Sequence, residues 1–219
     1  MANSWRISAL AEQHRKLGAE LEDWNGMGTA WNYAVSDTAD DHETIRTRAG
    51  LMDVSGLKKI HCNGPHAQAV LDYVTTRDMS KLYPGKSVYA SVLNEAGKFV
   101  DDCIVYRRGP EDLRIVVNAA NIAKDEAHFR EHAGSMCEIV NRSDETALIA
   151  VQGPKAEDVV GELCPAAREL RHLAAIPSAK NCFNFKHLYS IATSQNSVEF
   201  SDAGGRDSQR RPRTPRSTD

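Results

Sequence analysis

The sequence lacks the long apolar runs, cysteine pairs and charge excess that mark several large classes of protein. No apolar run approaches the roughly 20 residues that a transmembrane helix needs, so no membrane is expected as a partner. The five cysteines stand singly and form no CxxC pair, and no metal site is expected. A formal net charge of −3 gives no reason to expect nucleic acid as a partner. The N-terminal segment has neither a secretory h-region nor an Arg-rich transit pattern, which predicts a cytoplasmic location.

What the sequence does contain is enough apolar material for a folded core. It has 219 residues, of which 41% are hydrophobic and 26% charged, so it can hold one large domain or two small ones. The spacing of apolar residues predicts a helix from Trp5 to Glu22, a loop over 23–41, and a helix from His42 to Ala49. We expect Gly50 to end the latter helix in a left-handed conformation.

The stretch from Tyr89 to Asn118 reads as a strand, a glycine turn, an acidic strand, a polar turn and a further strand. The acidic strand opens with Asp101 and Asp102. Side chains alternate along a strand, so Asp102 and Tyr106 share one face and Asp101 lies on the other. One aspartate is therefore expected to point inward, although two solvated acids in a strand-entry turn would also fit the pattern.

A strand–Gly–Pro–helix pattern occurs twice. It follows the strand Leu57–Asn63 at Gly64 and recurs at Gly153, each time with apolar residues at helical spacing after the proline. The first helix should bury Ala67, Val70, Leu71 and Val74, and the second Ala156, Val159, Val160 and Leu163. With the expected helix Asn121–His132 between them, the element order predicts an α+β fold with a mostly antiparallel sheet.

Several blocks in a fixed order carry a resemblance. They are the residues around His42-Glu43 and Arg46, Gly50–Ser55, Asp78–Leu82, Leu93–Gly97, Asp101-Asp102, Ile104–Tyr106, Val116–Asn121, Lys124-Asp125, Asp144–Leu148 and Val151–Ala156. Together these blocks resemble the N-terminal part of the glycine cleavage T-protein (aminomethyltransferase) family, over roughly residues 9–171. Ordered blocks of this kind are far more specific than a single short motif. The resemblance implies a T-protein-like folate-binding fold built from pseudo-repeated strand–Gly-Pro–helix units.

The resemblance also implies a cofactor and a site. Family members bind tetrahydrofolate and transfer a one-carbon unit to it from an aminomethyl group on a lipoyl carrier. By similarity, Asp102 takes the catalytic carboxylate position, and Tyr89, Tyr106 and Asn118 take cofactor-binding positions. From the residues alone, the two tyrosines would also fit half-buried strand aromatics, and Asn118 a strand-end turn.

Some positions depart from the family pattern. A PFAGW-like segment is replaced by residues 21–27, which keep only Trp24, and the common DVSH reads Asp53-Val54-Ser55-Gly56. These changes leave the one-carbon donor open. The alternatives to an aminomethyltransferase are a folate-dependent demethylase of a methylated amine, a sulfonium compound or an aryl ether, and a non-catalytic fragment.

The resemblance fades after about residue 171, and a GYTGExGxE-like block with a folate-gripping glutamate does not follow. We therefore expect a folate-binding, T-protein-like portion over 1–171 and an unrelated, disordered basic tail over 172–219. An incomplete fold of this kind predicts an exposed sheet edge and self-association through it.

Overall fold

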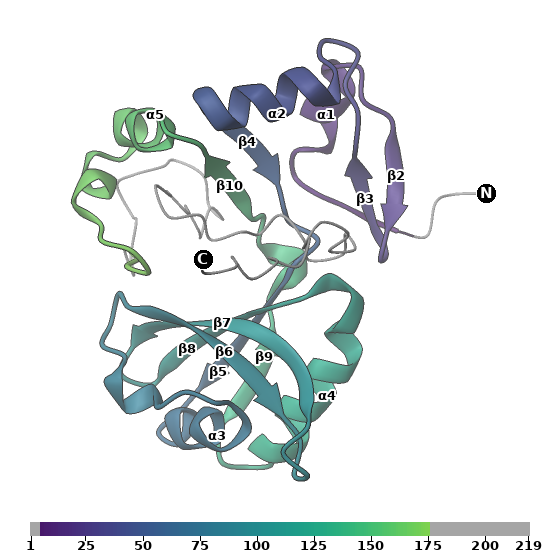
Figure 1. The fold of residues 1–219 in the computed structure, drawn as a ribbon. Helices are drawn as coiled ribbons and strands as arrows, with labels where there is room; N and C mark the ends of the chain where they lie inside the picture. The colour runs from purple at the N-terminus through teal and green to yellow at the C-terminus, as the bar shows by residue number, and fades with distance from the viewer. Residues whose placement is uncertain (1–4, 176–219) are drawn as a thin grey trace, which may run out of the picture.

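The computed structural model of this chain describes residues 5–175, which form two lobes built on three separate sheets (Figure 1). One lobe holds a five-stranded sheet with helices on one side. The other holds a three-stranded sheet, a two-stranded sheet and the remaining helices. The predicted tail, 172–219, lies outside the described residues from position 176 onward. No helix within residues 5–175 is both long and apolar enough to cross a membrane.

The N-terminal segment is a mixed unit rather than one helix. It contains β1 (Arg6–Ile7), α1 (Ala11–Lys16), β2 (Leu21–Trp24) and β3 (Met27–Ala30), with sheet order β1-β3-β2. The prediction of a helix from Trp5 to Glu22, followed by a loop, was therefore wrong. Gly18 adopts a φ of +80°, which L residues rarely adopt, and a Cβ there would lie 2.5 Å from Ala34 Cβ. The helix ends before this glycine, and antiparallel pairing with β3 then satisfies the backbone of β2.

The next helix begins earlier than its apolar residues predicted. α2 spans Thr38–Thr47 because the side chain of Asp37 caps it, accepting a hydrogen bond of 2.8 Å from the amide of Asp40. Gly50 is not a left-handed cap: it opens β4 (Gly50–Asp53) and pairs with Gln152 of β10 (Ile149–Gln152). A Cβ on Gly50 would lie 2.4 Å from Ile45 Cγ1, so close approach of α2 accounts for the glycine.

The five-stranded sheet has the order β6-β7-β8-β5-β9, with every neighbouring pair antiparallel. Its strands are β5 (Lys58–Asn63), β6 (Ser87–Leu93), β7 (Phe99–Gly109), β8 (Asp112–Val117) and β9 (Glu138–Asn141). Helices α3 (Ala67–Val74) and α4 (Ile122–Ala133) belong to the same lobe, and short 3-10 turns lie at Met79–Lys81, Ala119–Asn121, Ser143–Glu145 and Pro165–Glu169. This arrangement confirms the predicted α+β class with a mostly antiparallel sheet.

The main core lies between this sheet and its two helices. It is a cluster of buried apolar residues that includes Ile60, Leu71, Val105, Ile115 and Phe129. The opposite face of the sheet carries a smaller cluster of Leu57, Val116 and Leu148, against which Val54 and Tyr106 pack. Because Val54 and Leu148 come from the segments that join the lobes, this second cluster fixes the other lobe to the sheet.

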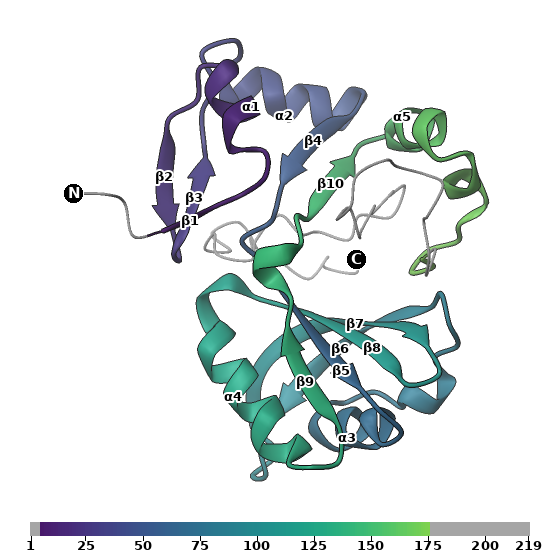
Figure 2. The same ribbon diagram turned by 180° about the vertical axis from the view of Figure 1, so that it is seen from behind.

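Two passages of the chain connect the strands of the two lobes (Figure 2). One runs from β4 into β5, and the other runs from β9 through the turn Ser143–Glu145 toward β10. The strands of the five-stranded sheet are therefore continuous in sequence, whereas the other lobe combines the segment before Val54 with β10 and α5. In addition, residues 173–175 return from the end of the other lobe to the start of β6, where Ser87 N donates to Leu173 O at 2.8 Å.

The repeated strand–Gly–Pro–helix pattern is present in three dimensions. Gly64 and Gly153 have φ angles of +123° and +119°, and each accepts a hydrogen bond from the first residue of the helix that follows. All four predicted residues of α3 are buried. In α5 (Ala156–Leu163), Ala156 and Val160 are buried, but Val159 and Leu163 are exposed, so the predicted apolar face was wrong for these two residues. Their side chains project away from the small cluster that β10, α5 and the following turn form.

Candidate functional site

The candidate site lies on the face of the five-stranded sheet that α3 and α4 do not cover. Asp101 and Asp102 sit near the start of β7 and point to opposite faces. Asp101 is 4% exposed and lies on the face that also buries Cys103 and Val105 in the main core. Asp102 is exposed on the other face. The alternation predicted from the sequence is confirmed, and the reading of both acids as solvated was wrong for Asp101.

Asn118, which directly follows the neighbouring strand β8, is hydrogen-bonded to both carboxylates. The β7–β8 pairing reaches Cys103 and Val117, so Asn118 lies across from Asp102 one step further along. Its Nδ2 donates to Asp102 Oδ1 at 2.8 Å and to Asp101 Oδ1 at 2.9 Å. Because hydrogen bonds to ionised acceptors are strong, this amide limits the orientations that the Asp102 side chain can take.

Two tyrosines flank Asp102 on the same face. Tyr89 of β6 lies directly opposite Ile104 of β7. Its diagonal neighbours on that face of β7 are therefore Asp102 and Tyr106. Burial and the neighbouring Tyr106 and Asp102 raise the pKa of Tyr89 to about 12, so its hydroxyl keeps its proton at neutral pH. Tyr106 packs against the smaller apolar cluster of this face.

The four residues singled out in the sequence thus come together on one sheet face. Tyr89, Asp102 and Tyr106 share that face, and Asn118 is bonded to Asp102 at its edge. The arrangement provides an anchored carboxylate next to half-buried aromatic rings. Such a surface can accept a flat, protonated or hydrogen-bond-donating ring and can stabilise a positive charge that develops beside the carboxylate.

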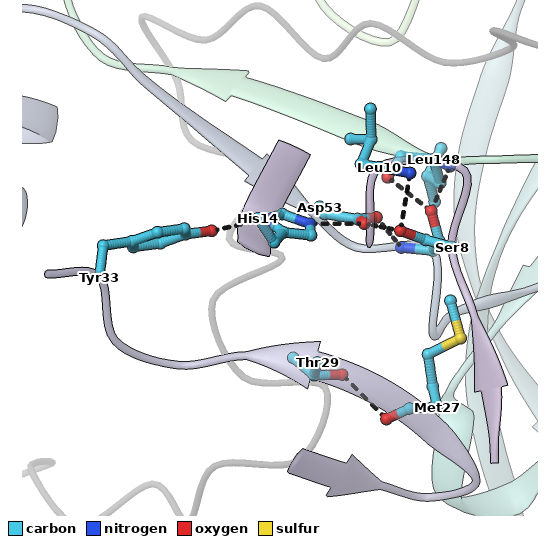
Figure 3. Close-up of polar contacts among 9 residues, drawn as sticks. Ser8, Leu10, His14, Met27, Thr29, Tyr33, Asp53 and Leu148 are labelled. Carbon is cyan, nitrogen blue, oxygen red and sulfur yellow. Dashed lines mark hydrogen bonds and ion pairs between the residues drawn. The ribbon is translucent and has the colours of Figure 1, made fainter. Parts of the chain in front are cut away.

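A second polar network lies in the other lobe, and no pattern in the sequence indicated it. Tyr33, His14, Asp53 and Ser8 form a connected chain of side chains (Figure 3). Asp53 Oδ2 accepts from the hydroxyl of Ser8 and from His14 Nε2 at 3.1 Å, while His14 Nδ1 is hydrogen-bonded to the hydroxyl of Tyr33 at 2.9 Å. The four residues come from separate segments, so spacing along the chain could not have revealed them.

Asp53 is the ionised centre of this network. Burial alone would raise the pKa of Asp53, but hydrogen bonds from Ser55, Ser8 and His14 outweigh burial and hold the pKa below its usual value. Burial and the charges of Asp53 and Asp41 raise the pKa of Tyr33. Since an ionised carboxylate can only accept, His14 donates through Nε2 to Asp53, and its Nδ1 is hydrogen-bonded to the Tyr33 hydroxyl.

Comparison with known proteins agrees with the resemblance seen in the sequence. The model of the GCVT N-terminal domain matches residues 10–180. This chain belongs to that family. The chain is 58% identical over 170 residues to the heme-dependent oxidative N-demethylase gamma subunit of Ectopseudomonas mendocina, which covers 78% of this chain and 44% of the relative. It is 47% identical over 153 residues to an aminomethyltransferase of Rubrobacter xylanophilus, which covers 69% of this chain and 40% of the relative.

A solved structure extends the similarity to the fold. The glycine cleavage system aminomethyltransferase T from Bartonella henselae matches with a TM-score of 0.72 and 31% sequence identity, over 78% of this chain and 47% of that protein. The chain thus spans less than half the length of these relatives. The fold is that of the N-terminal portion of a GCVT protein.

One departure from the family pattern now has a structural account. A Cβ on Gly56, where the family commonly has histidine, would lie 2.6 Å from Cζ3 of Trp24. Trp24 itself stands edge-on to Trp31, with ring centroids 6.0 Å apart. In this GCVT domain, therefore, an indole from β2 fills the space that a side chain at position 56 would occupy.

Proposed function

We propose that this GCVT domain binds tetrahydrofolate and takes part in the transfer of a one-carbon unit to it, as an aminomethyltransferase of the glycine cleavage T-protein type does. The observation that carries the proposal is the Asp102 carboxylate, exposed on the sheet face, bonded to Asn118 and flanked by Tyr89 and Tyr106. Family membership over residues 10–180 supports the same cofactor class.

The residues present fit a folate ring. A pterin is flat and carries N–H groups, so aromatic side chains can cover its faces while a carboxylate accepts its protons. Tyr89 and Tyr106 supply the aromatic surface, and Asp102 supplies the acceptor. Asn118 limits the orientation of Asp102, so less conformational freedom is lost when a ligand binds.

Asp102 then has a defined chemical role. In this proposal an aminomethyl donor would pass its one-carbon unit to tetrahydrofolate with release of ammonia, and positive charge would develop at the reacting atoms as the carbon–nitrogen bond breaks. A carboxylate beside the reacting nitrogens orients the nucleophilic amine and stabilises that charge. Tetrahydrofolate supplies the accepting nitrogens. The stabilisation grows as the ligand excludes water from the sheet face.

Calorimetry of the full chain with tetrahydrofolate tests the proposal. We expect saturable binding that is lost or weakened at least about tenfold in Asp102→Ala, which corresponds to about 1.4 kcal/mol. Asp158→Ala is the matched control, because Asp158 is an exposed carboxylate on α5. Equal affinities for the wild-type chain and the Asp102 variant would contradict the proposal, as would the absence of binding by a folded chain.

A folate-dependent demethylase is the second candidate. Two observations favour it: the 58% identity to an N-demethylase gamma subunit, and the filling of position 56 by Trp24, which alters the surface near the T-protein histidine position. A methylated amine, rather than an aminomethyl lipoyl carrier, would then be the source of the carbon unit; a sulfonium compound or an aryl ether are further donors of this class. Incubating the chain with tetrahydrofolate and each donor separates the two functions. An aminomethyl donor yields methylenetetrahydrofolate and ammonia, whereas a methyl donor yields methyltetrahydrofolate and the demethylated amine, thioether or phenol. If no donor loads folate although folate binds, the chain is a non-catalytic binding fragment.

We also propose that the chain acts as part of a larger assembly in the cytoplasm. The relative from Ectopseudomonas mendocina is named as a subunit, which supports a protein partner. Alternatively, the chain self-associates through an edge of the five-stranded sheet, at β9, since the backbone of the other edge strand, β6, is bonded to Leu173, Thr76 and Arg77. Light scattering over a range of chain concentrations tests self-association, since a mass that stays monomeric would exclude it.

A further inference from the structure

A buried carboxylic acid lies directly behind the candidate site. Asp125 is in the first turn of α4, which covers the face of the sheet opposite Asp102. Its side chain is 0% exposed, and neither of its carboxyl oxygens has a hydrogen-bond donor among the described residues. An ionised carboxylate in such a place would carry a large desolvation cost with nothing to offset it.

The group that faces Asp125 is itself a buried acid. Asp101 of β7 contacts Asp125 through its side chain. The Oδ1 atom of Asp101 accepts from Asn118 Nδ2 at 2.9 Å and from the amide of Asp102 at 2.9 Å, while its Oδ2 is buried without a donor. Two carboxylates in contact cannot both ionise at low cost, whereas a carboxylic acid and a carboxylate can share one hydrogen bond.

We infer that Asp125 is a protonated acid that donates its O–H to Oδ2 of Asp101, and that Asp125 thereby acts as a positioning residue for Asn118 and Asp102. The hydrogen bond satisfies Oδ2 of Asp101 and one oxygen of Asp125. Asp101 stays anionic, so Oδ1 remains a strong acceptor for Asn118, and the same amide of Asn118 also holds Asp102. The second part of this inference rests on the proposed function; the shared proton does not.

The charges around the pair agree with this assignment. From β7, Asp101 and the Cys103 thiol face Asp125, while the charge of Asp102 acts on Asp125 from the other face of the sheet. On α4 the neighbouring Lys124 donates to the carbonyl of Val100 at 2.6 Å. Burial, together with Asp101, raises the pKa of Asp125 to about 8. Burial would also raise the pKa of Asp101, but hydrogen bonds from Asp125 and Asn118 outweigh it and lower that pKa. The proton therefore resides on Asp125.

Ionisation of Asp125 would disturb the site on the other face. Above a pH of about 8, two negative charges would meet behind Asn118. Their repulsion would move Asp101, and the shared amide would transmit the movement to Asp102. The affinity for tetrahydrofolate should therefore fall as the pH rises through this value.

Carbon NMR of the full chain with labelled aspartate carboxyls tests the shared proton directly. We expect one carboxyl signal to titrate with a midpoint near 8. That titration should vanish in Asp125→Asn, whose amide donates to Asp101 at every pH. It should also vanish in Asp101→Asn, because the new amide would donate to an ionised Asp125. If every aspartate of the wild-type chain titrates below about pH 5, in the ordinary range of carboxyl groups, the inference is wrong.

The positioning role is tested by the pH profile of tetrahydrofolate binding. We expect the wild-type chain to lose affinity at least about tenfold between pH 7 and 9, and Asp125→Asn to keep its affinity over that range. The same loss in both proteins would overturn the positioning role. If neither protein binds tetrahydrofolate at any pH, the proposed function fails, while the carboxyl titration still decides the shared proton.

Discussion

The indole of Trp24 lies where a side chain at position 56 would have to stand, 2.6 Å from a Cβ built on Gly56. Trp24 belongs to β2 in the N-terminal lobe, whereas Gly56 lies in the passage that leads from β4 to β5. Of the two positions, Gly56 departs from the T-protein pattern, whereas Trp24 keeps to it. A side chain at position 56 should therefore be tolerated only if Trp24 moves or is replaced.

Restoring the family histidine should destabilise this chain. We expect Gly56→His to lower the free energy of unfolding by about 1–3 kcal/mol, because the imidazole displaces Trp24 from its packed position. Urea denaturation measures the change. Gly109→Ala is the matched control, since a Cβ there meets only Asp112 Cβ, at 3.7 Å. When Trp24 is replaced by alanine, Gly56→His should lower the unfolding free energy much less than it does in the wild-type chain. Equal losses with and without Trp24 would show that the histidine does not clash with Trp24.

The Asp53 network should make stability depend on acid. The pKa of Asp53 is lowered in the folded state, so its contribution is present above the unfolded value of 3.8 and is lost as the pH falls through the folded value. At neutral pH, Asp53→Asn should cost about 1–3 kcal/mol, because an amide cannot accept all the donors that the carboxylate satisfies.

Urea titrations at pH 7 and at pH 3 would check this dependence on Asp53. The difference in unfolding free energy between the wild-type chain and Asp53→Asn should narrow at pH 3. This pH lies below the ordinary value of 3.8, so the unfolded chain binds a proton there that the folded Asp53, with its lowered pKa, resists. Asp158→Asn, at an exposed position, should show no gap at either pH. A gap that stays constant would mean that the carboxylate charge contributes nothing.

Much of the fold could be predicted from the sequence, because short-range patterns determine it. Alternation along β7 separated Asp101 from Asp102, and the Gly–Pro pattern located α3 and α5. The N-terminal segment failed because apolar residues at helical spacing also occur where the chain turns at Gly18 and pairs β2 with β3. There, pairing between strands determined the structure more than local spacing did.

Some residues of the two polar sites could be predicted from the sequence, and others could not. Tyr89, Asp102, Tyr106 and Asn118 could be named because a family motif marks their positions. Asp125 and the Asp53 network depend on contacts between distant segments, such as His14 with Asp53. The sequence around Asp125 predicts a helix, but it does not show that β7 places the carboxyl group of Asp101 against Asp125.

Asn118 should be sensitive to a change that preserves its shape. Asn118→Asp replaces the amide that donates to Asp101 and Asp102 with a third negative charge, and we expect a loss of about 1–3 kcal/mol in unfolding free energy at pH 7. The loss should shrink in acid, because protonation relieves the repulsion. Asn94→Asp provides the comparison, since Asn94 uses only its Oδ1, as an acceptor from the amides of Ala96 and Lys98. Similar losses at both positions would argue against charge repulsion.

The two repeated glycines should differ in their tolerance of alanine. Both have positive φ angles, so each substitution should cost about 1–3 kcal/mol in backbone strain. At Gly153 a Cβ would also lie 2.5 Å from the carbonyl oxygen of Ile45 and 2.6 Å from that of Arg48, whereas at Gly64 the nearest atom is 3.7 Å away. The midpoint temperature of thermal unfolding should therefore be clearly lower for Gly153→Ala than for Gly64→Ala. The opposite order would show that contact with α2 is not what constrains Gly153.

The two passages between the lobes have a consequence for the order in which the chain acquires its structure during synthesis. All strands of the five-stranded sheet lie between Lys58 and Asn141, so this sheet can form as soon as β9 has left the ribosome. β4 is made earlier but has no partner until β10 appears, about a hundred residues later. The lobe that contains β4 is therefore synthesised first but completed last, because β4 can pair with β10 only after the whole five-stranded sheet has been synthesised.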